Sequence, residues 1–77
     1  MIEIYRERMG RLRTNLKIVF ELISKLDDRL IYTTDPIEEL KFRRERQRLK
    51  EYANELTADL LEVKKLLREE IKEVDKF

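Results

Sequence analysis

Hydrophobic residues recur along the first part of the chain at alternating intervals of three and four. The series runs Ile2, Tyr5, Met9, Leu12, Leu16, Val19, Ile23, Leu26 and Leu30. This heptad spacing places every member on one face of an α-helix. We therefore predict one helix from about residue 2 to 32. The series keeps its phase across Gly10, which favours a continuous helix over a break at that position.

A second heptad series occupies the latter part of the chain. Its members are Phe42, Leu49, Ala53, Leu56, Leu60, Val63, Leu67, Val74 and Phe77. Arg46 and Glu70 stand at two positions of the same series as charged interruptions. The pattern predicts a second helix from about residue 36 to 76.

Pro36 marks the boundary between the two series. Proline disfavours helical geometry at the residue before it and lacks an N–H, but it suits the first position of a new helix. Asp35 is then the N-cap and Glu38 the third helical residue, an arrangement that resembles a capping box. We predict a turn at residues 33–35. One long helix kinked at Pro36 is the structural alternative.

The expected fold is an all-α antiparallel hairpin of two long helices, contained in a single domain of residues 1–77. At 1.5 Å per residue the two helices would be roughly 45 and 60 Å long, so residues 68–77 should extend past the start of the first helix. Additional apolar residues flank both series: Ile18, Phe20, Leu22, Tyr52, Leu61, Leu66 and Ile71. Since two helices need only one seam, these residues imply a further layer. Either a homodimer forming a four-helix bundle or coiled coil, or a partner helical domain, would supply it.

The residues predicted to make the interface combine the two seams with part of the flanking set. They are Leu12, Leu16, Val19, Phe20, Leu22, Ile23, Leu26, Leu49, Tyr52, Leu56, Leu60, Val63, Leu66 and Leu67.

The amino-acid composition limits the kinds of catalytic and binding site that the chain can form. Charged residues make up 45% of the chain and hydrophobic residues 42%, with one glycine and one proline, which is typical of long helices. The chain has no histidine or cysteine, and Ser24 is its only serine, so triads of the Ser-His-Asp or Cys-His type are excluded. We expect no enzymatic activity, no metal or cofactor and no small-molecule substrate. The longest apolar runs are three residues, so we expect no membrane span and a cytoplasmic location.

Residues 41–50 concentrate positive charge in a chain whose net charge is only +1. Nucleic-acid binders usually gather such charge on one face, whereas these cations are spaced around the whole helix. A small nucleic-acid-associated protein remains the alternative function, as does a regulatory subunit that binds a larger enzyme. The residues that would contact nucleic acid are Arg43, Arg44, Arg48 and Lys50.

Arg46 is unusual because it stands on the hydrophobic seam between Phe42 and Leu49. Counting from a turn centred near Thr34 places it opposite Leu22 and Ile23. Its side chain either extends outward to water along its methylene groups or fixes register and pairing, for example with Glu21 or Glu45 of another chain.

The segment around the turn also resembles a known family. Thr34-Asp35, Lys41-Phe42, Leu49 and Glu55-Leu56 are similar to the helical-hairpin effector-associated adaptor modules of multidomain bacterial signalling and conflict proteins. The resemblance covers about half of the chain. It implies an adaptor that recruits like domains by homotypic contact, and it brings no catalytic residues. Our functional expectation is a non-enzymatic protein–protein interaction or oligomerisation module.

Overall fold

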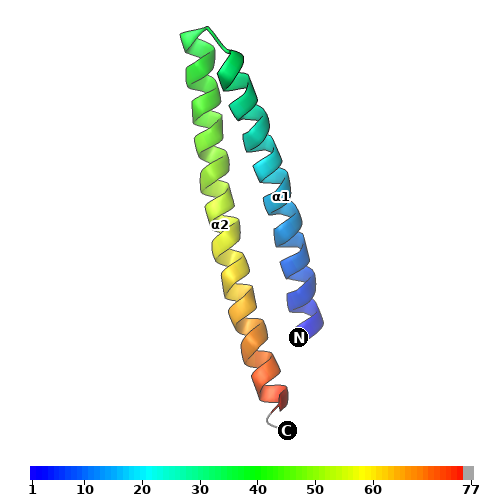
Figure 1. Ribbon diagram of the computed structural model, residues 1–77. Coiled ribbons are helices and arrows are strands. Elements are labelled where there is room, and N and C mark those ends of the chain that lie inside the picture. The colour runs from blue at the N-terminus through cyan, green and yellow to red at the C-terminus, as the bar shows by residue number, and fades with distance from the viewer. Residues whose placement is uncertain (76–77) are drawn as a thin grey trace.

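The computed structural model describes residues 1–75 and shows two long helices folded into an antiparallel hairpin (Figure 1). Helix α1 spans Ile2–Tyr32 and helix α2 spans Pro36–Asp75. The predicted fold class and the break at Pro36 are confirmed. The predicted helix end at residue 76 and the seam position Phe77 lie outside the described residues, as does the side chain of Val74.

The turn is formed by three residues whose hydrogen bonds close both helix ends. Thr33 is extended, and both its backbone N–H and its hydroxyl donate to the carbonyl oxygen of Arg29, at 2.9 and 2.7 Å. Asp35 caps α2, because its Oδ1 accepts a hydrogen bond of 3.0 Å from the backbone N–H of Ile37. An aspartate at this position also places negative charge at the positive end of the helix dipole.

Gly10 does not interrupt α1, as the phase of the heptad series predicted. The hydroxyl of Thr14 donates a hydrogen bond of 2.9 Å to the Gly10 carbonyl oxygen. A methyl group added at Gly10 would meet no atom within 4 Å. The glycine is therefore not needed for close packing.

The core is a narrow seam between the two helices. Leu12, Val19 and Ile23 of α1 pack in one cluster with Ala53, Leu56 and Val63 of α2. Val63 is the most deeply buried of them, with 1% of its surface exposed. Heptad spacing explains this alignment, because it returns each seam residue to the same side of its helix.

The hairpin is a rod 64 Å long and 14 Å across in each other direction. Figure 1 shows that the last turns of α2 extend beyond the N-terminus of α1, as the unequal helix lengths predicted. Within the described residues, neither helix contains a stretch long and apolar enough to span a lipid bilayer.

Candidate functional site

The predicted interface residues divide into three groups by exposure. Leu12, Val19, Ile23, Leu26, Leu56 and Val63 are buried in the hairpin itself. Leu16, Leu49, Leu60, Leu66 and Leu67 are half-buried at its margins. Phe20, Leu22 and Tyr52 are exposed. The seam residues are therefore already partnered within one chain, while the exposed three are not covered by it.

The exposed apolar residues lie on opposite sides of the seam. Successive residues of a helix are rotated by about 100°, so Phe20 and Leu22 diverge to the two flanks of α1. Leu22 borders a hollow shared with Lys25, Arg29, Glu45 and Arg48. Phe20 borders a different hollow, shared with Lys50, Asn54 and Thr57 of α2. Each hollow joins one flank of α1 to one flank of α2.

We name the first side the Leu22 flank. It contains the residues that recur at intervals of three and four from the exposed residues bordering its hollow, and that therefore lie on the same side of each helix. On α1 it comprises Ile4, Arg8, Arg11, Asn15, Ile18, Leu22, Lys25, Arg29 and Tyr32. On α2 it comprises Glu38, Lys41, Glu45, Arg48, Tyr52, Glu55, Asp59, Glu62, Leu66, Glu69 and Glu73.

The second side, the Phe20 flank, is defined in the same way. On α1 it comprises Glu3, Arg6, Gly10, Arg13, Lys17, Phe20, Ser24, Asp27 and Ile31. On α2 it comprises Leu40, Arg43, Gln47, Lys50, Asn54, Thr57, Leu61, Lys64, Arg68 and Ile71.

Charge differs sharply between the two flanks. On the Leu22 flank, α1 presents cations and no carboxylate, while α2 from Tyr52 to Glu73 presents carboxylates and no cation. On the Phe20 flank, cations come from both helices and the only carboxylates are Glu3 and Asp27. The first flank therefore carries separated opposite charges away from the turn and mixed charges near it, where α2 presents Lys41 and Arg48 as well as Glu38 and Glu45. The second flank is basic throughout most of its length.

The Leu22 flank also holds a compact apolar patch. Ile18 and Leu22 lie one turn apart on α1 and are 49% and 42% exposed, and Tyr52 of α2 is 45% exposed. The contacts of Arg29 with Phe42 and of Arg46 with Asp27 show the register of the two helices. In that register Tyr52 lies level with the Ile18–Leu22 turn. The three side chains thus form one patch that crosses both helices.

Arg46 is held by a partner in its own chain. Its Nε donates a hydrogen bond of 2.5 Å to Oδ1 of Asp27, and the two side chains are 33% and 45% exposed. The partner differs from the Leu22 and Ile23 position that counting from the turn predicted. Side chains lean toward the N-terminus of their own helix, so in an antiparallel pair Arg46 leans toward the turn and Asp27 leans away from it. The two groups meet because these directions converge.

The basic segment 41–50 does not form one surface. Arg43 bonds to Glu39 at 2.7 Å and Arg46 to Asp27. Arg44 and Arg48 border a shallow hollow with Lys41, Phe42 and Glu45, whereas Lys50 borders the hollow beside Phe20. The residues predicted as a nucleic-acid contact are therefore distributed over different sides of α2.

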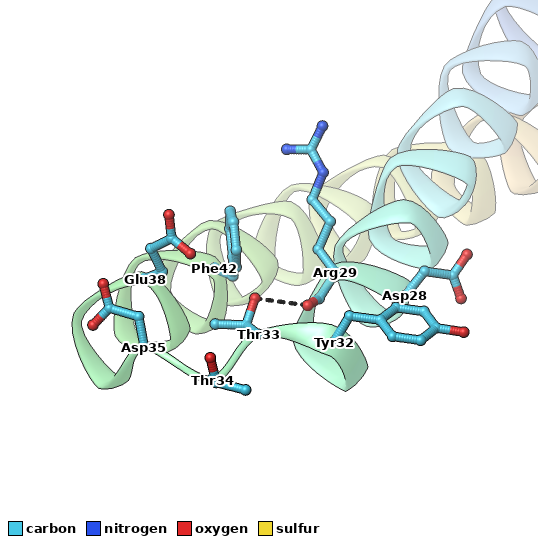
Figure 2. Close-up of a pocket in the computed structure, with 8 residues that line it drawn as sticks. All are labelled: Asp28, Arg29, Tyr32, Thr33, Thr34, Asp35, Glu38 and Phe42. Carbon is cyan, nitrogen blue, oxygen red and sulfur yellow. Dashed lines mark hydrogen bonds between the residues drawn. The ribbon is translucent and has the colours of Figure 1, made fainter.

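A further hollow of about 420 Å³ lies at the turn, and sequence reasoning did not anticipate it. Figure 2 shows that its lining includes the carboxylates of Asp28, Asp35 and Glu38. The Arg29 guanidinium lies 5.9 Å from the centre of the Phe42 ring, within cation–π range. Asp35 lines the hollow because it caps α2, and Arg29 and Phe42 line it because they contact each other. The way the hairpin closes at this end therefore explains why these residues lie together.

The side chains offer no cluster suited to metal-dependent chemistry within the described residues, where no three acidic groups come close enough to hold an ion. Comparison with protein-family models, with curated proteins and with solved structures finds no match. The family resemblance of residues 34–56 is therefore untested.

Proposed function

We propose that this chain is a non-enzymatic protein–protein interaction module that acts by self-association, with two hairpins forming a four-helix bundle. The observation that carries the proposal is the exposure of Ile18, Leu22 and Tyr52, which the register of the two helices places at one level of the same flank. Monomeric surfaces tolerate scattered hydrophobic residues, but a contiguous patch with polar neighbours favours an interaction site.

The mechanism is burial of apolar surface, at about 25 cal/mol per Å² removed from water, with charge selecting among partners. Tyr52 is well suited to such a patch because its ring buries a large area while its hydroxyl stays near water. The homotypic adaptor role implied by the bacterial signalling and conflict modules is one form of this function. Docking on a helical domain of another protein is a second form.

Sedimentation equilibrium of the isolated 77-residue chain over a range of concentrations tests self-association. We expect a mass of twice the 9.5 kDa monomer or more, falling toward the monomer mass on dilution. Leu22→Lys combined with Tyr52→Lys should shift the chain to monomer with its helical circular dichroism retained. A wild-type chain that stays monomeric at every concentration would reject self-association.

The nucleic-acid alternative receives less support from the surface of the hairpin. Two of the segment's cations, Arg43 and Arg46, bond to carboxylates of the same chain. Of the remaining cations, Lys41, Arg44 and Arg48 border one shallow hollow that Glu45 also lines, and Lys50 lies on another side of α2. The basic ridge of these three residues is short and contains the carboxylate of Glu45, whereas nucleic-acid binders usually concentrate basic charge along one face.

A further inference from the structure

We infer that the second copy of this chain binds through the Leu22 flank alone, about a two-fold axis parallel to the helices, with both turns at the same end. The inference rests on the proposed self-association and specifies its surface and geometry. The sequence prediction included Phe20 and Leu22 together in the additional interface, although they lie on opposite sides of the seam. Charge distinguishes the two sides.

Self-association through the Phe20 flank would bring like charges together. Cations such as Arg13 and Lys17 of α1 and Lys50 and Lys64 of α2 would meet the same cations of the second copy, whichever helix lay opposite. Like charges placed against each other across an interface cost several kcal/mol. The other exposed apolar residues of that flank, Ile31, Leu40, Leu61 and Ile71, lie two turns or more along the hairpin from Phe20, so they do not extend its ring into one patch.

The half of the Leu22 flank away from the turn is complementary to itself in charge. Arg8 and Arg11 on α1 lie level with Asp59 and Glu62 on α2 in the register of the hairpin. Nearer the turn the charges are mixed, because Lys25 and Arg29 border a hollow that both Glu45 and Arg48 line. The ion pairs formed within the described residues are Arg43–Glu39 and Arg46–Asp27, so these opposite charges are not paired with each other inside one hairpin. They are free to face a second copy.

The orientation of the second copy follows from which helices must meet. A two-fold axis parallel to the helices places α1 over α2 of the partner at the same level, so Arg8 and Arg11 meet Asp59 and Glu62, and the Ile18–Leu22 turn meets Tyr52. A two-fold axis perpendicular to the helices places α1 over α1, where cations meet cations. The first arrangement pairs the apolar patch with itself and pairs the opposite charges in the half of the flank away from the turn.

The flank is comparable in size with the interface of a dimer. The face shared by both helices is about 46 Å long, the length of α1, and 14 Å wide, an outline of roughly 650 Å², against ~800 Å² per partner in a standard interface. In an all-antiparallel bundle of this kind each helix has two antiparallel neighbours, the usual packing of four-helix bundles. The basic Phe20 flank would remain on the outside.

A charge-swap experiment tests the surface. Arg8→Glu with Arg11→Glu gives one double variant, and Asp59→Lys with Glu62→Lys gives the other. We expect the homodimer of each variant to have a dissociation constant at least about tenfold higher than that of the wild type, because like charges then face each other. An equimolar mixture should recover a heterodimer, since both contacts become complementary again. Arg13→Glu with Lys17→Glu, the same charge change on the Phe20 flank, should dimerise at least as well as the wild type.

Spin labels test the orientation. The chain has no cysteine, so Thr34→Cys provides a single labelling site at the turn. Two turns at one end should give a label separation well under half of the 64 Å hairpin length, whereas turns at opposite ends would give a separation near that length.

The outcomes separate the two proposals. If the wild type is monomeric, self-association and this inference both fail. If the wild type dimerises but the Leu22-flank variants behave like it, or if the Phe20-flank variant dissociates instead, the inference alone fails. Labels at opposite ends would overturn the parallel axis. Circular dichroism of each variant establishes that its helices remain folded.

Discussion

The Nε atom of Arg46 in α2 lies 2.5 Å from Oδ1 of Asp27 in α1, and this ion pair connects the two helices at the edge of the seam. It places a cation among hydrophobic neighbours without burying it, because a third of its side chain stays exposed. Partly exposed ion pairs of this kind contribute roughly 0–1 kcal/mol, since water screens them. The pair therefore allows a polar residue to occupy a seam position, but it adds little to the stability of the hairpin.

Arg46→Leu should leave the free energy of unfolding unchanged or raise it by about 1 kcal/mol, because leucine adds apolar contact between Phe42 and Leu49 and Asp27 can rehydrate. Urea unfolding followed by circular dichroism measures this, at one fixed protein concentration because dimer stability depends on concentration. The sedimented mass should not change, since the pair lies within one chain. Loss of association in Arg46→Leu, but not in Asp27→Asn, would instead support a role for Arg46 in pairing between copies.

Gly10→Ala should raise the free energy of unfolding by up to about 1 kcal/mol, because alanine has the higher helix propensity. The added methyl group has open space around it. For a domain of this size the gain corresponds to a rise of about 4–8 °C in the melting temperature. Ala58→Gly, at an exposed position of α2, should lower the melting temperature by a similar amount. A destabilised Gly10→Ala variant would show that Gly10 serves an unrecognised contact.

Asp35→Ala should lower the free energy of unfolding by about 1 kcal/mol, since the Ile37 N–H loses its hydrogen-bond acceptor at the start of α2. Asp35→Asn retains an acceptor oxygen and should recover most of that loss. Thermal melts of the two variants and of Thr34→Ala, at the neighbouring exposed position, make the comparison. Equal melting temperatures for all three variants would contradict the capping role.

Val63→Ala should cost about 2 kcal/mol, because it removes two methyl groups from the most buried side chain of the core. Leu61→Ala is the matched control, since Leu61 is 61% exposed and lies on the Phe20 flank. Its effect should stay within about 0.5 kcal/mol. A large loss at Leu61, accompanied by dissociation, would indicate that the Phe20 flank is covered in the assembled protein.

Titration with duplex and single-stranded nucleic acid at two salt concentrations should give no binding tighter than the non-specific range of about 10⁻⁴–10⁻⁶ M at physiological salt. The reason is the net charge of +1 and the distribution of the 41–50 cations around α2. A nanomolar dissociation constant with a steep salt dependence would favour the nucleic-acid alternative. Arg44→Glu with Arg48→Glu should then weaken binding.

Local features of the sequence determined the two helices and their boundary. The three-and-four spacing sets the face of each helix that can be buried, and Pro36 with Asp35 sets where the second helix begins, so both could be predicted without knowledge of the other helix. The same spacing identified the buried residues from Leu12 to Val63. These predictions succeeded because each depends on residues within a turn or two of one another.

The tertiary structure decided what depends on two helices at once. Asp27 as the partner of Arg46 follows from the opposite lean of side chains on antiparallel helices, which position counting ignores. The hollows beside Leu22 and Phe20 show which flank of α1 adjoins which flank of α2. Only that alignment places the α1 cations beside the α2 carboxylates on one flank and joins Ile18, Leu22 and Tyr52 into a patch. The spacing of residues along one helix does not show which flank of the other helix it will adjoin. That pairing of flanks is decided when the hairpin closes.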